Sequence, residues 1–176
     1  QNRLAFGYTI TAGLVSGAFI GYLNSAQQVF QEQYALGDLF SIYFGIVASA
    51  IGLASLLNSR LVLHFGMRVL VRSALLITSI LSAIVLVSTL LLPEQLPFVL
   101  FMAYLMLSFF CVGILFGNLN SLAMEPLGQM AGIGAAIVGS LSTFISVLLG
   151  TFIGQSYNGT IVPLVTGLAV LSGLSL

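Results

Sequence analysis

The sequence predicts an all-α membrane protein with six transmembrane helices, and three observations support this prediction. Only 5% of the 176 residues are charged, against roughly 25% in a typical soluble domain. Hydrophobic residues make up 59% of the chain, and the mean hydropathy is +1.17. The long charge-free stretches do not alternate with period two, so they favour spanning helices over the strands of a membrane barrel.

The same composition excludes several other classes of protein. A soluble domain needs a polar surface that these residues cannot supply. Nucleic-acid binding needs basic patches to neutralise phosphates, but the chain has four arginines and no lysine. Apolar residues dominate, which excludes intrinsic disorder, and the lone Cys111 excludes a disulfide framework.

The helices follow from the charge-free stretches, taken in order. The stretches 4–31, 39–59, 73–93 and 95–124 are each long enough for one span. The stretch 126–176 is too long for one span, and the turn-forming residues from Gln155 to Thr160 divide it. We therefore expect six helices, at about 4–26, 38–58, 69–92, 97–120, 130–155 and 160–176.

The charged residues fall on opposite sides of these six spans. Arg3 precedes the first span, and an expected loop after the second span contains Arg60, His64, Gly66 and Arg68, with Arg72 one turn later. The loops on the opposite side contain Glu32, Asp38 and Glu94 and no basic residue. The positive-inside rule then makes the arginine side cytoplasmic.

Glycines recur four residues apart, on one face of a helix. They are Gly13, Gly17 and Gly21 in the first span, Gly113 and Gly117 in the fourth, and Gly150 and Gly154 in the fifth. Helices in a bilayer associate through close packing of small residues, so we expect these faces to be contact faces. Similar ridges of small residues occur in the second span (Gly45, Ala48, Gly52, Ser55) and the fifth (Gly132, Gly139, Thr143, Ser146). The same faces would also allow helices to slide during a transport cycle.

A short internal repeat predicts the internal symmetry. The segments Gly21–Ser25 and Gly117–Ser121 match at four of five positions, and each ends the first helix of a three-helix set. Because the two ends face opposite sides, the pattern indicates an inverted three-plus-three repeat, which is typical of secondary transporters.

The residues of the chain do not favour an enzyme. The single histidine, His64, and the single cysteine, Cys111, are expected at different depths, so they cannot supply the three or four ligands of a metal site. The spans contain neither histidine nor lysine to activate a serine, and no phosphate-binding loop is present. We expect no cofactor. The acids, including Glu125, fall at helix ends, so a proton-coupling carboxylate is expected outside this chain.

Polar and aromatic residues within the spans are the candidates for a substrate cavity. They are Tyr22, Asn24, Phe40, Tyr43, Asn118, Ser140 and Phe144. A side-chain amide in hydrocarbon must be paired or hydrated. Two interpretations remain open for these residues: hydrogen bonding between helices, or lining a cavity for a bulky amphipathic ligand.

Three stretches resemble one known family. Residues 22–36 resemble the exit of the seventh helix in the bicyclomycin- and chloramphenicol-resistance drug:proton antiporters of the major facilitator superfamily. Residues 58–68 are similar to the central cytoplasmic loop of that family's second half, and residues 118–139 look like its junction of helices ten and eleven. No acid stands at the matching place near Ser59 and no carboxylate lies inside the spans, so neither a charge relay nor a proton site is carried over.

This resemblance implies the carboxy-terminal half, helices seven to twelve, of a twelve-helix transporter in the bacterial inner membrane. The missing initiator methionine and the absence of a polar tail also predict a piece of a longer chain, although omitted tails would look the same. The expected function is proton-coupled export of drugs or small hydrophobic compounds by alternating access. The expected partners are the lipid bilayer, the amino-terminal half, the substrate and protons, without nucleic acid. A nutrient importer of the same superfamily, a non-transporting scaffold subunit and a membrane enzyme are the alternatives.

Overall fold

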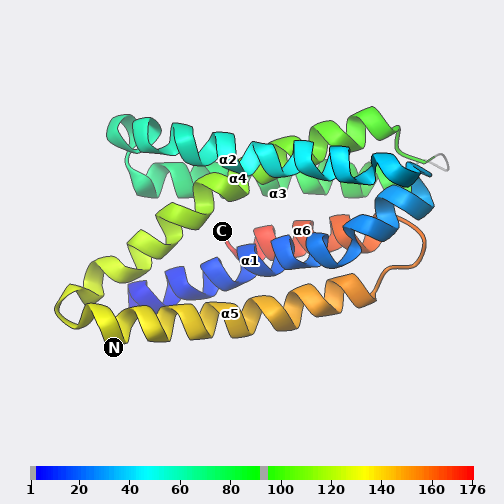
Figure 1. Cartoon of the computed structure of the whole chain (residues 1–176). Coiled ribbons are helices and arrows are strands. Elements are labelled where there is room, and N and C mark those ends of the chain that lie inside the picture. Colours follow the sequence, from blue (N-terminus) through cyan, green and yellow to red (C-terminus); the bar gives the residue numbers. More distant parts are fainter. Residues whose placement is uncertain (1–2, 92–94) are drawn as a thin grey trace.

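The computed structural model describes residues 3–91 and 95–176, and the regular structure in this part of the chain is entirely helical (Figure 1). The helices are α1 (Arg3–Gln28), α2 (Phe40–Phe65), α3 (Met67–Leu91), α4 (Phe98–Met124), α5 (Ala131–Gln155) and α6 (Val162–Leu174). A π-helical turn, Val29–Gln33, extends α1, and short 3₁₀ turns precede α2 and α5. The predicted six-helix fold class is confirmed.

Five of these helices, α1 to α5, are long and apolar enough to cross a membrane. The spans of α1, α2 and α4 include an adjoining π or 3₁₀ turn. The exception in the described chain is α6, which has 13 residues where the sequence predicted a span at 160–176. At 1.5 Å per residue, α6 is shorter than the roughly 30 Å hydrocarbon core of a bilayer.

The connection between α2 and α3 differs from the expected loop. Helix α2 continues to Phe65, α3 begins at Met67, and Gly66 alone separates them with a φ of 77°. Arg60 and His64 therefore lie in the last turns of α2, and Arg68 lies in the first turn of α3. Residues 59–65 contain no glycine or proline to end the helix, so the helix stops only where a residue tolerates positive φ.

The six helices are arranged as two inverted sets of three. Figure 1 shows α1 and α4, the first helices of the two sets, running in opposite directions along the bundle. α1 packs against α5 and α6, and α4 packs against α2 and α3 in the same way. α1 contacts α4, and α3 contacts α6. These pairings are those that a two-fold axis between the sets would produce.

Two glycines make this relationship visible at the level of residues. A methyl group added to Gly17 would lie 3.1 Å from Leu149 Cβ of α5, and one added to Gly113 would lie 2.8 Å from the Ile51 carbonyl oxygen of α2. Gly17 and Gly113 are equivalent in the internal repeat, because each lies four residues, about one turn, before its repeat segment. The two equivalent contacts, α1 with α5 and α4 with α2, are thus each formed around a glycine.

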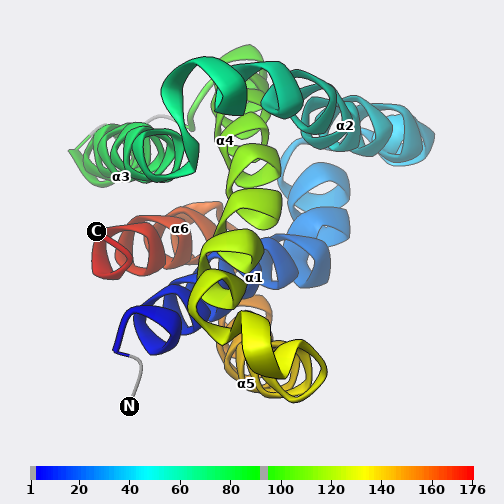
Figure 2. The same cartoon turned by 90° about the vertical axis from the view of Figure 1, so that its left-hand side faces the viewer.

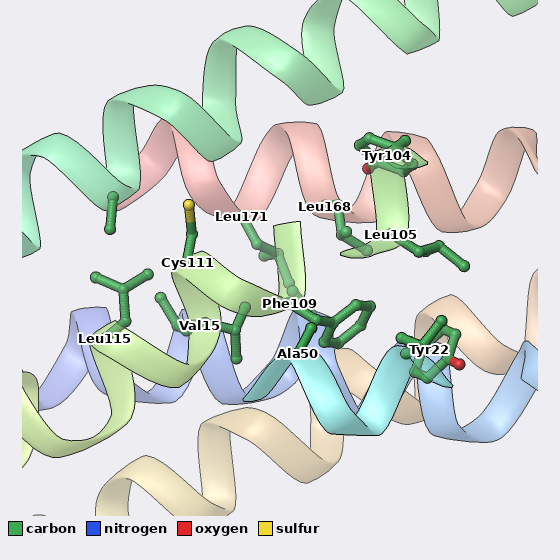
Figure 3. Close-up of a cluster of buried hydrophobic side chains, with 14 of the residues drawn as sticks. Val15, Tyr22, Ala50, Tyr104, Leu105, Phe109, Cys111, Leu115, Leu168 and Leu171 are labelled. Carbon is green, nitrogen blue, oxygen red and sulfur yellow. The ribbon is translucent and has the colours of Figure 1, made fainter. Parts of the chain in front are cut away.

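The core runs along α1 and α4, which cross at the centre of the bundle, whereas α2 and α5 are largely exposed (Figure 2). Aromatic and branched side chains fill this crossing, including Tyr22 from α1 and Phe109 from α4 (Figure 3). A void of about 20 Å³ lies between α1, α3, α4 and α6. It has room for about one water molecule, so this part of the interior is closely packed.

The charged residues of the described chain lie at opposite ends of the bundle. The start of α1 and the α2–α3 and α4–α5 turns share one end, which carries the four arginines and Glu125 (Figure 1). The α1–α2 connection at the other end carries Glu32 and Asp38. We call these the arginine end and the acidic end. Glu94 lies outside the described residues.

Candidate functional site

The structure distributes the seven cavity candidates over three environments. Tyr22 and Asn118 are buried, Phe40 and Tyr43 are half-buried, and Asn24, Ser140 and Phe144 are exposed. None of the seven lines the small void between α1, α3, α4 and α6.

Tyr22 joins three helices. Its ring stacks on Phe44 of α2 at 5.9 Å with an interplanar angle of 5°, and its centroid lies 4.5 Å from that of Phe109 of α4. The side chain is 2% exposed, and the hydroxyl has no hydrogen-bond partner. A buried hydroxyl without a partner carries a free-energy cost of about 1–3 kcal/mol, so this group is poorly accommodated in the present arrangement of α1 and α2.

Asn24 lies two residues further along α1, against α5. Its Nδ2 donates to the Gly150 carbonyl oxygen at 3.3 Å, and a methyl group added to Gly154 would lie 2.5 Å from Asn24 Cβ. The missing side chains of Gly150 and Gly154 thus give the amide access to the α5 backbone. Asn24 remains partly exposed, so its carbonyl oxygen is accessible for a further hydrogen bond.

Asn118 pairs with Asn58, which sequence reasoning placed at the very end of the second span. Its Nδ2 donates to Asn58 Oδ1 of α2 at 2.7 Å and to the Ile114 carbonyl oxygen at 2.8 Å. This amide pair joins α4 to α2 near the arginine end. Asn58 could have been suspected from its spacing only if α2 had been extended past residue 58.

Phe40 and Tyr43 belong to an aromatic cluster at the acidic end. Phe40 packs on Phe30 at 6.0 Å, and Tyr43 meets Phe98 edge to face at 4.8 Å. The cluster also includes Tyr34, which stacks on Phe101 and donates from its hydroxyl to the Leu96 carbonyl oxygen at 3.0 Å. Burial raises the pKa of Tyr34, so this donor stays protonated. The cluster closes the acidic end between α1, α2 and α4.

Ser140 and Phe144 lie on the exposed side of α5. The Ser140 hydroxyl donates only to the Ile137 carbonyl oxygen of its own helix, and Phe144 is 64% exposed. Both side chains are free to meet a ligand or another helix.

Exposed polar side chains of α1 and α4 lie on the side of the bundle between α2 and α5, and we call this set the polar strip; its members on α1 lie near the acidic end and its member on α4 near the arginine end. On α1, Gly21 faces α5 and Tyr22 faces α2 and α4, so the exposed Asn24 and Gln27 lie between these contacts. On α4, the exposed Asn120 occupies the position of the repeat that matches Asn24, whereas Ser121 matches the buried Ser25. Figure 2 shows α3 and α6 packed together on the opposite side of the bundle. The residues of this strip, Asn24, Gln27 and Asn120, are uncharged and carry side-chain amides.

Glycines distinguish packed faces from free ones. Gly13, Gly21, Gly150 and Gly154 are so close to a neighbouring helix that an added methyl group would come within 3 Å of a side chain, whereas Gly117 leaves 3.8 Å. The ridge glycines that border the polar strip have no neighbour within 4 Å; they are Gly45 and Gly52 on α2 and Gly132 and Gly139 on α5. The α2 ridge and the 132–143 part of the α5 ridge are therefore open in the described chain, whereas Ser146, at the end of the α5 ridge, is buried against α1.

Sequence reasoning did not single out the buried hydroxyls between α3 and α4. The Ser82 and Tyr104 hydroxyls lie 3.0 Å apart, and Ser108, one turn after Tyr104, is fully buried. Tyr104 and Ser108 are four residues apart on α4, and this helical spacing was the available signal. Within the described residues there is no group of three His, Cys, Asp or Glu side chains that could hold a metal ion.

Comparison with known proteins points to transport. The chain is 27% identical over 159 residues to an uncharacterised MFS-type transporter, YdgK, of Bacillus subtilis (strain 168), and the match covers 88% of this chain and 38% of that protein. No family model matches the chain, and no solved structure matches it significantly. The chain thus spans less than two fifths of this curated relative.

This similarity supports membership of the major facilitator superfamily and, together with the apolar helices, an integral multi-pass membrane protein. It favours a transporter over an enzyme.

Proposed function

We propose that this chain is the carboxy-terminal six-helix half of a secondary transporter that exports drugs or other small hydrophobic compounds, driven by protons. The observation that carries the proposal is the uncharged polar strip, bordered on both sides by the open ridges of small residues. A strip of this kind is unfavourable against lipid and suitable for a substrate cavity.

The two ridges support docking of an amino-terminal half. Small residues in spans allow close approach of a second helix, and the described neighbours of α2 and α5 leave Gly52 and Gly139 uncovered. Since the chain covers 38% of its relative, a protein of that length has room for a second six-helix bundle. The two bundles would enclose the polar strip between them.

The chemistry of the strip and of the exposed side of α5 supports the class of substrate. Asn24, Asn120 and Ser140 offer hydrogen bonds without charge, and Phe144 adds an exposed aromatic surface. Such a lining suits an amphipathic molecule better than a charged nutrient. The described acids lie at helix ends, so we expect the carboxylate that carries the proton in the amino-terminal half. By the positive-inside rule, we expect the arginine end on the cytoplasmic side.

Resistance of a cell that produces the intact protein tests this function. The cell should lack its own efflux pumps, and survival should be measured against several unrelated compounds, with protein level determined in parallel. Ser140→Leu and Asn120→Leu should change which compounds are exported at unchanged protein level, because they alter the cavity. Ile80→Leu, on the exposed side of α3, is the matched control and should behave as wild type.

Two results would contradict the proposal. If cells that produce the intact protein survive every compound no better than cells without it, export of this class is excluded. If the producing cells accumulate the compounds and become more sensitive, an importer is favoured. In inside-out vesicles, export is measured as uptake of the compound into the vesicle. Uptake that continues after the proton gradient is collapsed would exclude proton coupling.

A further inference from the structure

We propose that Arg68 and Arg72 bind the headgroup of an anionic phospholipid whose acyl chains lie along the exposed apolar side of α3. This site is separate from the polar strip, and it does not depend on the proposed transport function.

The charge balance at the arginine end calls for an anion. Four arginines and one acid, Glu125, lie there in the described chain. Glu125 accepts from Arg68 through a single contact of 3.3 Å between two largely exposed side chains. Arg72 has no acidic partner among the described residues. A guanidinium remains charged, and at the edge of the hydrocarbon its favoured partner is a phosphate, which it can bind through two parallel hydrogen bonds.

The position of Arg72 on α3 points toward lipid. Arg68 and Arg72 are one turn apart and both exposed, whereas Val71 and Ala74 face the core. The same side of the helix continues with Leu76, Val87 and Leu90, which are 39%, 53% and 64% exposed. An arginine at the end of such an apolar surface extends its head toward the interface.

A concavity beside Arg68 provides space for the headgroup. It measures about 280 Å³ and lies between the α2–α3 turn and the end of α4, with Phe65, Met67, Val69 and Leu122 beside Arg68 and Glu125. The pairing of a guanidinium with apolar walls suits a glycerophosphate that continues into acyl chains. A free anion would gain nothing from these walls or from the apolar side of α3.

Competition between lipids in native mass spectrometry of the intact protein tests this site. The purified protein is mixed with equal amounts of phosphatidylglycerol and phosphatidylcholine, and the retained lipids are compared. We expect preferential retention of phosphatidylglycerol. Arg72→Gln should weaken it about fivefold, the effect of one basic residue near an anionic surface, and Arg72→Lys should restore most of it. Arg60→Gln, which removes an equal charge at the same end from α2, is the matched control and should change little.

Three results would overturn the proposal. Arg72→Gln could retain phosphatidylglycerol as wild type does, or Arg60→Gln could lose as much, which would indicate a general charge effect. Glycerol phosphate without acyl chains could displace the lipid at equal concentration, which would indicate a site for free anions. Elution of the variants at the wild-type volume in size-exclusion chromatography shows that they are folded.

Discussion

Asn118 of α4 donates a 2.7 Å hydrogen bond to Asn58 of α2, so that two amides 60 positions apart satisfy each other near the arginine end. The pair lies beside the Gly117 contact with α2, where the two helices approach closely enough for short side chains to meet. Asn24 likewise donates to a neighbouring helix, at the Gly150 carbonyl oxygen of α5, whereas the exposed Asn120 donates to the Phe116 carbonyl oxygen of its own helix.

Replacing Asn118 by leucine should destabilise the protein by about 1–2 kcal/mol, because Asn58 Oδ1 would lose its donor. Unfolding of the purified intact protein in detergent by increasing denaturant measures the change. Asn58→Leu should have a similar effect, and the double variant should lose less than the sum of the two. Additive losses would mean that the two amides do not interact.

Replacing Gly113 by alanine should destabilise the contact of α4 with α2 by about 1–3 kcal/mol. The added methyl group would lie 2.8 Å from the Ile51 carbonyl oxygen, and backbone cannot move aside as a flexible side chain can. Gly7→Ala, on an open part of α1, is the control. It should leave stability unchanged or slightly raised, because alanine favours helix. Equal behaviour of the two variants in thermal unfolding would contradict this contact.

Single cysteines introduced at His64 and Asn158 in a Cys111→Ser background should react with an impermeant thiol reagent from opposite sides of the membrane. His64 lies at the arginine end, and Asn158 lies in the α5–α6 connection at the acidic end. The positive-inside rule predicts that the residue at position 64 is labelled from the cytoplasm. Labelling of both positions from one side would exclude the six-span arrangement.

Replacing Tyr22 by phenylalanine should preserve or raise stability, because the removed hydroxyl has no partner. Tyr22→Ala should cost about 3–5 kcal/mol through the loss of the ring that packs between α2 and α4. If the hydroxyl meets substrate in another conformation, Tyr22→Phe will also change the range of exported compounds at unchanged protein level. A loss of stability in Tyr22→Phe would reveal a partner for the hydroxyl.

Composition and charge placement were enough to predict six helices, and an internal repeat predicted their arrangement in two inverted sets. A chain with so few charges lies in the bilayer core, where its backbone N–H and C=O groups must be hydrogen-bonded within helices. The repeat of Gly21–Ser25 in Gly117–Ser121 marked the symmetry that the packing of α1 on α5 and α4 on α2 displays. The end of α2 was misplaced by seven residues because polar side chains such as Ser59 and Arg60 were interpreted as a loop, although they are compatible with a helix at the membrane surface.

The sequence by itself determined that the chain is helical, lies in a membrane and carries its arginines at one end. Only the tertiary structure decided which faces of those helices meet protein. Gly113 is closed by α2 while Gly52 is open, and Tyr22 is buried while Asn24 is exposed. The reason is that a spanning helix is apolar all round, because lipid and protein neighbours are equally apolar. Its periodicity therefore cannot distinguish the two, and the crossing of α1 with α4 selects the buried side of each helix.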